Sequence, residues 1–161
     1  MFVVDALVGN FDRHNGNWGF LFDEQTDRAE IAPAYDCGSC LLPQADERIM
    51  RNVLSDENEM NSLIFQFPTS AIKLNGKKIN YFDFLSGGAD TNCMEAIKRI
   101  APAINIPLVS AWIREQPYIS ELQKDFYSKY IEARYELLIA PVLTQIYSQN
   151  ERLSAEPNLS M

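Results

Sequence analysis

The residues of this sequence that could do chemistry are concentrated in one polar stretch. The single histidine, His14, lies in NFDRHNGNWGFLFD, residues 10–23, together with Asp12 and Asn17 in a D-x-x-x-x-N pattern. Asp36 follows in YDCGS. A carboxylate can orient or deprotonate a hydroxyl group, and aspartate and asparagine oxygens can hold Mg²⁺ against phosphates. These residue types therefore indicate phosphoryl transfer to a hydroxyl group.

The segments around this stretch are expected to position it. Residues 1–9 predict the last turns of a buried helix, and the apolar runs at 18–22 and 28–33 have the pattern of a β-hairpin. A hairpin brings both of its strand ends to the same edge, so the polar loop and the second aspartate should meet there. Within the hairpin, Trp18 and Phe20 are expected to be core residues rather than a platform for adenine.

The remainder of the sequence predicts a mainly α fold with a small β-hairpin near the N-terminus. The other expected elements are helices over 44–55 and 59–67, a tight hairpin at 73–79 with Asn75-Gly76 in its turn, a helix capped by Asp90 or Thr91, a helix beginning near Pro107, and a long helix opened by a Ser120–Gln123 capping box. The apolar stripe of the long helix is Ile119, Leu122, Phe126, Tyr130 and Leu137. Pro141 should kink or divide this helix, and the tail after Gln149 is expected to be flexible.

Length and composition limit the classes of function. The 161 residues suffice for about one domain, and the formal net charge is −8 with no stripe of lysine and arginine. Direct nucleic-acid binding is therefore not expected, because it depends on clustered cations. No apolar run is long enough to span a bilayer, and the N-terminus lacks the pattern of a secretory signal. The sequence predicts a cytoplasmic protein without a membrane partner.

The cysteines do not form a recognised redox or zinc motif. Cys37 and Cys40 have C-x-x-C spacing, but Leu-Leu-Pro follows them instead of the helix that a thioredoxin-like site requires. A structural zinc needs four ligands, and only Cys93 and His14 remain, both distant in sequence. The pattern favours two small residues in a turn, and the odd number of cysteines suits a reducing compartment.

The opening motif resembles the catalytic loop of kinases. Protein kinases carry an aspartate, an asparagine five residues later, a short hairpin and a D-F-G aspartate. Here the histidine follows the first aspartate, as DRHNGN, which is similar to the phosphatidylinositol 3- and 4-kinases and to the bacterial HipA-type serine/threonine kinases. The flanking residues, ALVGNFDRHNGNWGFL and IAPAYDCGSCLLP, favour the HipA type, because the lipid kinases usually have a D-F-G-like apolar residue where this chain has Cys37-Gly38.

This resemblance implies an organisation and a role for each site residue. It implies a kinase-like C-terminal lobe over 1–150, with a catalytic loop at 10–19, a metal-binding turn at 34–40, a helical bundle at 44–149 and a flexible tail at 150–161. Asp12 would be the catalytic carboxylate, and His14 would neighbour the γ-phosphate or structure the loop. Asn17 and Asp36 would bind Mg²⁺ and, through it, ATP. Arg13 would pair with Asp36 or with a phosphate.

A kinase also needs a second lobe, with a Gly-rich loop and a strand lysine, and neither pattern is found in this sequence. We therefore expect a kinase C-terminal lobe that phosphorylates a protein substrate but has little activity alone, whether it is a truncation, half of a split kinase or a relic. Its partner would be a separately encoded N-lobe or an antitoxin. Half of a split kinase should expose an apolar patch near Phe2, Val3 and the hairpin.

Three alternatives remain open at this point. The polar residues could be ordinary turn residues of a non-enzymatic helical interaction or regulatory module. The chain could also be the lobe of a phosphoinositide-type lipid kinase. A metal-dependent phosphoesterase fits least well, because such enzymes usually need more histidine or aspartate ligands than this sequence offers.

Overall fold

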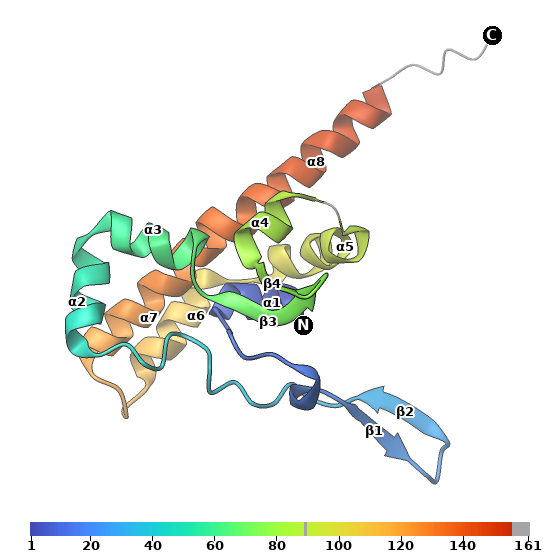
Figure 1. Ribbon diagram of the computed structural model, residues 1–161, viewed down its shortest axis with the longest axis horizontal. Coiled ribbons are helices and arrows are strands. Elements are labelled where there is room, and N and C mark those ends of the chain that lie inside the picture. Colours follow the sequence, from blue (N-terminus) through green and yellow to red (C-terminus); the bar gives the residue numbers. More distant parts are fainter. Residues whose placement is uncertain (89, 156–161) are drawn as a thin grey trace.

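The computed structural model describes residues 1–88 and 90–155, which form a helical body from which one hairpin projects (Figure 1). The predicted mainly α fold is confirmed. The elements are α1 Phe2–Val8, η1 Asn15–Asn17, β1 Phe20–Asp23, β2 Arg28–Ile31, α2 Glu47–Ser55, α3 Glu57–Phe65, β3 Thr69–Leu74, β4 Lys77–Asn80, α4 Tyr81–Ser86, α5 Thr91–Ile100, η2 Ala101–Ala103, α6 Ile106–Glu115, α7 Glu121–Arg134, η3 Tyr135–Ile139 and α8 Ala140–Ala155. None of the helices described is long and apolar enough to cross a membrane.

Helix α1 lies at the centre of the helical body and leads directly into the polar loop (Figure 1). Its residues Val3, Ala6 and Leu7 are buried in the core, and it contacts α7, α5 and η3. A seven-residue helix without a side-chain N-cap has little stability of its own. Burial against the surrounding helices therefore holds α1, and with it the start of the loop, in place.

The long C-terminal helix begins as predicted and is divided as predicted. Ser120 and Gln123 form the capping box, and the π-helical segment η3 separates α7 from α8, whose second residue is Pro141. Proline has no N–H to continue the helical ladder, and a widened π turn at this point accommodates the missing donor. The inserted residue shifts the phase of the apolar stripe, so Leu138 is buried and Leu137, predicted to be in the stripe, is exposed.

The tail predicted from residue 150 overlaps the end of helix α8. Helix α8 continues to Ala155, so the predicted boundary near residue 150 is wrong for residues 150–155. Residues 156–161 of the predicted tail lie outside the described part of the chain.

Arg134, the last residue of α7, is fully buried and joins two helix ends. Its Nε donates to the Ala6 carbonyl in the last turn of α1 and its Nη1 to the Leu63 carbonyl in the last turn of α3, both at 2.6 Å. Its guanidinium also lies over the rings of Tyr81 and Tyr130. The C-termini of helices carry partial negative charge, so two of them compensate this buried cation in place of a carboxylate.

The two β-hairpins differ in their surroundings. The β3–β4 hairpin has Asn75 and Gly76 at φ 52° and 79°, as the predicted tight turn requires, and it packs against α4. In the β1–β2 hairpin every strand residue is exposed, and Phe20 is 64% and Trp18 41% exposed. The prediction that Trp18 and Phe20 are core residues is therefore wrong, because within the described chain the helical body does not cover this hairpin (Figure 1).

Candidate active site

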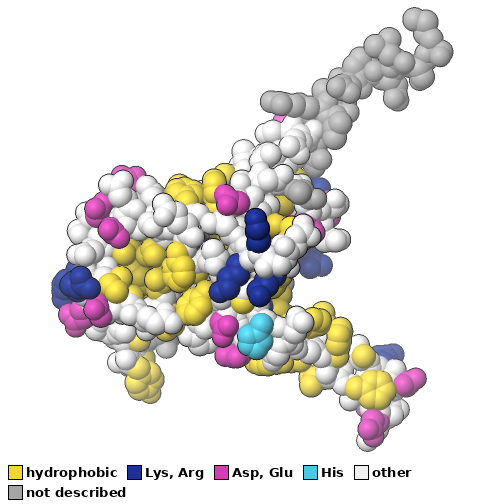
Figure 2. Space-filling view, viewed as in Figure 1, with side chains coloured by type: hydrophobic (Ala, Val, Ile, Leu, Met, Phe, Trp, Pro, Cys, Tyr) yellow, Lys and Arg dark blue, Asp and Glu magenta, His cyan; other side chains and the backbone are white. Residues whose placement is uncertain are grey.

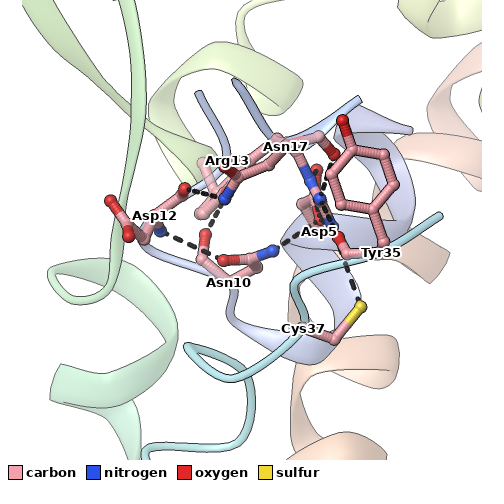
Figure 3. Close-up of polar contacts among 8 residues, drawn as sticks. Asp5, Asn10, Asp12, Arg13, Asn17, Tyr35 and Cys37 are labelled. Carbon is pink, nitrogen blue, oxygen red and sulfur yellow. Dashed lines mark hydrogen bonds and ion pairs between the residues drawn. The ribbon is translucent and has the colours of Figure 1, made fainter. Parts of the chain in front are cut away.

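The guanidinium of Arg13 holds the candidate site together (Figure 3). Its Nε and Nη2 donate to the Asp5 carboxylate at 3.1 to 3.2 Å, and both side chains of this ion pair are only 3% exposed. Its Nη1 donates to the carbonyls of Asn17 at 2.8 Å and Tyr35 at 2.7 Å. One side chain thus joins α1, the polar loop and the turn that carries Asp36.

This geometry corrects the prediction for Arg13. Its carboxylate partner is Asp5, a residue in the middle of α1, and not Asp36. Hydrogen bonding to Asp5 raises the pKa of Arg13 and outweighs burial, which acts in the opposite direction. A guanidinium so fully engaged is a structural cation of the site, and it is not available to bind a phosphate.

The backbone before Asp12 is fixed by the buried side chain of Asn10. The Asn10 amide donates to Asp5 at 3.0 Å, its Oδ1 accepts from the Asp12 N–H at 3.0 Å, and its carbonyl accepts from the Tyr81 hydroxyl. Gly9, at φ 65°, makes the turn out of α1, and a Cβ there would lie 2.1 Å from the Tyr130 hydroxyl. The Asp12 carboxylate is left exposed on a rigid support.

Asn17 is held in an orientation that suits a metal ligand. Its side chain is buried, and its Nδ2 donates to the Asp12 carbonyl at 2.9 Å. That bond fixes the amide plane, and the described residues provide no hydrogen bond to the opposite atom, Oδ1. An oriented amide oxygen without another partner is the atom type that Mg²⁺ prefers.

The residue before Asp36, Tyr35, is bound to this loop at two points. The carbonyl of the preceding Tyr35 is bound by Arg13, and the Tyr35 hydroxyl donates to the Gly16 carbonyl at 3.1 Å. Asp36 itself is exposed and has φ 56°, in the left-handed region that aspartate tolerates better than most residues. The structure therefore fastens the polar loop to the Tyr35 segment at the base of the β1–β2 hairpin, and the meeting of the Asp36 carboxylate with Asn17 stays a prediction.

His14 structures the loop locally. Its Nδ1 accepts the Gly16 N–H at 3.0 Å and caps the short helix η1. A neutral His14 with Nδ1 as acceptor carries its proton on Nε2. The ring is exposed, so Nε2 is free to face a ligand.

The donor set fits a magnesium ion held jointly with phosphates. Asn17 and Asp36 supply hard oxygen atoms, and Asp12 lies on the same loop. Within 1–88 and 90–155, no three histidine, cysteine, aspartate or glutamate side chains gather into a metal site. Mg²⁺ commonly takes only one or two protein carboxylates and completes its shell with water and phosphate oxygens, so this small donor set suits it.

An apolar cavity of about 390 Å³ adjoins the loop. Its lining includes Phe2 of α1, His14 and Trp18 of the loop, Ile31 of β2 and Ile72 of β3. In Figure 2 apolar side chains continue from the region of the histidine along the projecting hairpin. The predicted apolar patch is therefore present on the hairpin, whereas Phe2 is half-buried against the core and Val3, 2% exposed, belongs to the core.

Sequence reasoning missed the residues that support the loop. Asp5, Asn10 and Tyr81 were not among the candidate residues, although each makes a buried hydrogen bond within the site. One signal was available for Asp5, because it is the only charged residue in the apolar run 1–9. A charge in a buried helix requires a partner. Nothing local to Tyr81 indicates its role.

Comparison with known proteins identifies the class of the fold as kinase-like. No family model matches the chain. It is 46% identical over 140 residues to the serine/threonine-protein kinase CtkA of Helicobacter pylori strain J99. The aligned region covers 86% of this chain and 43% of that protein. A crystal structure of a Helicobacter pylori proinflammatory kinase CtkA superposes with a TM-score of 0.89 at 43% identity, over 93% of this chain and 55% of that chain.

The chain is therefore homologous to a serine/threonine kinase, and it spans about half the length of the relatives that it matches. This homology supports a kinase-like function for the matched region.

Proposed function

We propose that this chain is the catalytic lobe of an ATP-dependent, HipA-like protein serine/threonine kinase. The observation that carries the proposal is the Arg13 cluster, in which one guanidinium binds the carbonyls of Asn17 and Tyr35 and so joins the D-x-x-x-x-N loop to the Asp36 turn. A loop that made only a turn would not need a buried ion pair to fasten it to a second turn. The kinase named among the relatives supports the same class of chemistry.

In the proposed reaction the protein positions the acceptor and the nucleotide. Asp12, exposed on a rigid backbone, orients the acceptor hydroxyl and accepts its proton. Asn17 Oδ1 and the Asp36 carboxylate would hold Mg²⁺, which would supply positive charge beside the phosphates. His14 presents Nε2–H beside the loop, where it can donate a hydrogen bond to a phosphate oxygen.

The exposed apolar surface supports a second lobe as partner. Phe20, Phe22 and Ile31 of the β1–β2 hairpin are largely exposed, and Ile31 also lines the cavity beside His14. An isolated two-stranded hairpin is only marginally stable in water, so a covering partner would stabilise it. We propose that a nucleotide-binding lobe, encoded in the same or a separate chain, packs here, and that the residues 1–161 alone bind Mg²⁺–nucleotide weakly with little phosphotransfer.

The test is Mg²⁺-dependent nucleotide binding by the chain and by matched variants. Asn17→Ala and Asp36→Ala should each lose the Mg²⁺-dependent part of ATP binding, measured by calorimetric titration. Asn15→Ala, an exposed asparagine of the same loop, is the control for the first. Asp27→Ala is the control for the second, because Asp27 is also exposed and left-handed, at φ 51°.

Retained binding in both active-site variants would contradict the assignment of the loop and favour the non-enzymatic interaction module. With a nucleotide-binding lobe supplied in trans, Asp12→Ala should abolish phosphorylation of a protein acceptor. Phosphorylation of a phosphoinositide in place of the protein would favour the lipid-kinase alternative.

A further inference from the structure

The C-x-x-C pair lies in a turn whose geometry suits a disulfide. The Cys40 N–H donates to the Cys37 carbonyl at 3.1 Å, so the two cysteines are the first and last residues of a β-turn. The Cα atoms at these positions lie within about 7 Å, which overlaps the range of about 4.4 to 6.8 Å found across natural disulfides. Both thiols are free, Cys37 exposed and Cys40 half-buried. The pKa of the Cys40 thiol is raised to about 12, mainly by burial and secondly by the neighbouring Cys37.

The outer cysteine of the pair also belongs to the Arg13 cluster. Arg13 Nη2, which binds Asp5, also donates to Cys37 Sγ at 3.9 Å (Figure 3). Asp36 is the residue immediately before Cys37 and has a left-handed backbone. Movement of the Cys37 sulfur therefore acts on both the Arg13 cluster and the backbone of Asp36.

We propose that Cys37 and Cys40 are a thiol-oxidation site that closes to an intramolecular disulfide and thereby withdraws Cys37 Sγ from Arg13. The site differs from a thioredoxin-type motif, because no helix begins at the pair and the turn itself supplies the geometry. The expected effect on nucleotide binding rests on the function proposed above, whereas formation of the disulfide does not.

The reaction balances with a low-molecular-weight disulfide such as glutathione disulfide as oxidant. The exposed Cys37, as thiolate, attacks one sulfur of the oxidant and releases one glutathione thiolate, which takes up the proton that Cys37 lost. The Cys40 thiol then gives up its proton and attacks the Cys37 sulfur of the mixed disulfide, releasing the second glutathione. Two protein thiols are oxidised by two electrons, and one glutathione disulfide is reduced to two thiols.

The first experiment tests the bond itself. The full chain is equilibrated in mixtures of reduced and oxidised glutathione, alkylated, digested and mapped by mass spectrometry. A Cys37–Cys40 cross-link should dominate at intermediate ratios, and Cys40→Ser should carry glutathione on Cys37 instead. Cys93, on α5, is the internal control and should stay reduced where the pair is oxidised. Glutathione adducts without a cross-link, or oxidation of Cys93 before the pair, would overturn the proposal.

The second experiment tests the coupling to the site. Hydrogen exchange over residues 10–19 should become faster in the oxidised chain than in the reduced chain, and the Cys37→Ser/Cys40→Ser variant should not respond to the oxidant. Unchanged exchange in a fully cross-linked chain would overturn the coupling. In parallel, oxidation should weaken Mg²⁺–ATP binding by about tenfold, as expected when the support of a metal ligand is disturbed. If the reduced chain fails to bind Mg²⁺–ATP, the proposed function is wrong. The peptide mapping and the hydrogen exchange would still show whether the disulfide forms and whether it acts on the loop.

Discussion

Replacing Arg13 by methionine should destabilise the protein by about 3 to 5 kcal/mol. The substitution leaves the Asp5 carboxylate buried, and among the residues that the structure describes only the Asn10 amide still donates to it. Removing one partner of a buried ion pair costs about 3–5 kcal/mol. The carbonyls of Asn17 and Tyr35 also lose a charged donor. If the loop opens they can accept hydrogen bonds from water instead, so no further loss of stability is added for them. Since small domains are stable by about 5–15 kcal/mol, this one change should remove a large part of the total.

The assay is denaturant unfolding followed by circular dichroism, with an exposed ion pair as matched control. Arg114 and Asp125 are 56% and 54% exposed, and Arg114→Met should cost less than about 1 kcal/mol. Arg13→Lys should fall between the two, because one ammonium cannot reach the carboxylate and both carbonyls. The double variant Asp5→Leu/Arg13→Met should be more stable than Arg13→Met alone, since it removes the stranded charge. A loss for Arg13→Met as small as that of the control would refute the reasoning.

Three further predictions concern the support of the loop and the exposed hairpin. Gly9→Ala should lower the stability, measured by thermal unfolding, by about 1–2 kcal/mol for its left-handed backbone, and by a further amount because the new Cβ overlaps the Tyr130 hydroxyl. The control Gly76→Ala, at φ 79° in open space, should show only the loss for the left-handed backbone. Burial raises the pKa of Tyr81 and of Tyr130 from 10.0 to about 12, so the neutral forms stabilise the fold. The contribution of these neutral tyrosines to stability should be fully present below pH 10 and be lost as the pH rises towards about 12. In an ultraviolet titration these two tyrosines should be the last to ionise. Phe20→Ser should leave the unfolding free energy within about 0.5 kcal/mol and reduce the binding of a hydrophobic dye, because this ring is exposed.

Local signals were sufficient for most of the helices and for the contact between the polar loop and the segment that leads to Asp36. The capping box at Ser120 and the Asn75-Gly76 turn are decided within a few residues, and the structure contains both. The hairpin likewise brings Tyr35, the residue before Asp36, to the polar loop, because it joins strands that are adjacent in sequence.

The features that were missed depend on contacts between distant residues. Arg134 and Ala6 are 128 positions apart, and Tyr81 and Asn10 are 71 apart, so no local pattern announces either contact. The exposure of Phe20 could not be predicted either. An apolar strand residue has the same sequence pattern whether its own helical body or a separate lobe covers it. The π turn before Pro141 moved the apolar stripe by one residue, which a regular helical period cannot anticipate.

The measurement that tests the central claim most directly is paramagnetic broadening by Mn²⁺, used in place of Mg²⁺ with ATP, in the NMR spectrum of the chain. If the loop and the turn form one metal site, the side-chain amide of Asn17 and the backbone amide of Asp36 should broaden first, together with Asp12. The amide of Asp27, at the far end of the hairpin, should stay sharp (Figure 1). Residues 56–59, Asp-Glu-Asn-Glu, are exposed and acidic. Broadening of these residues with sharp signals from the loop would show instead that the ion binds this acidic segment and would contradict the account.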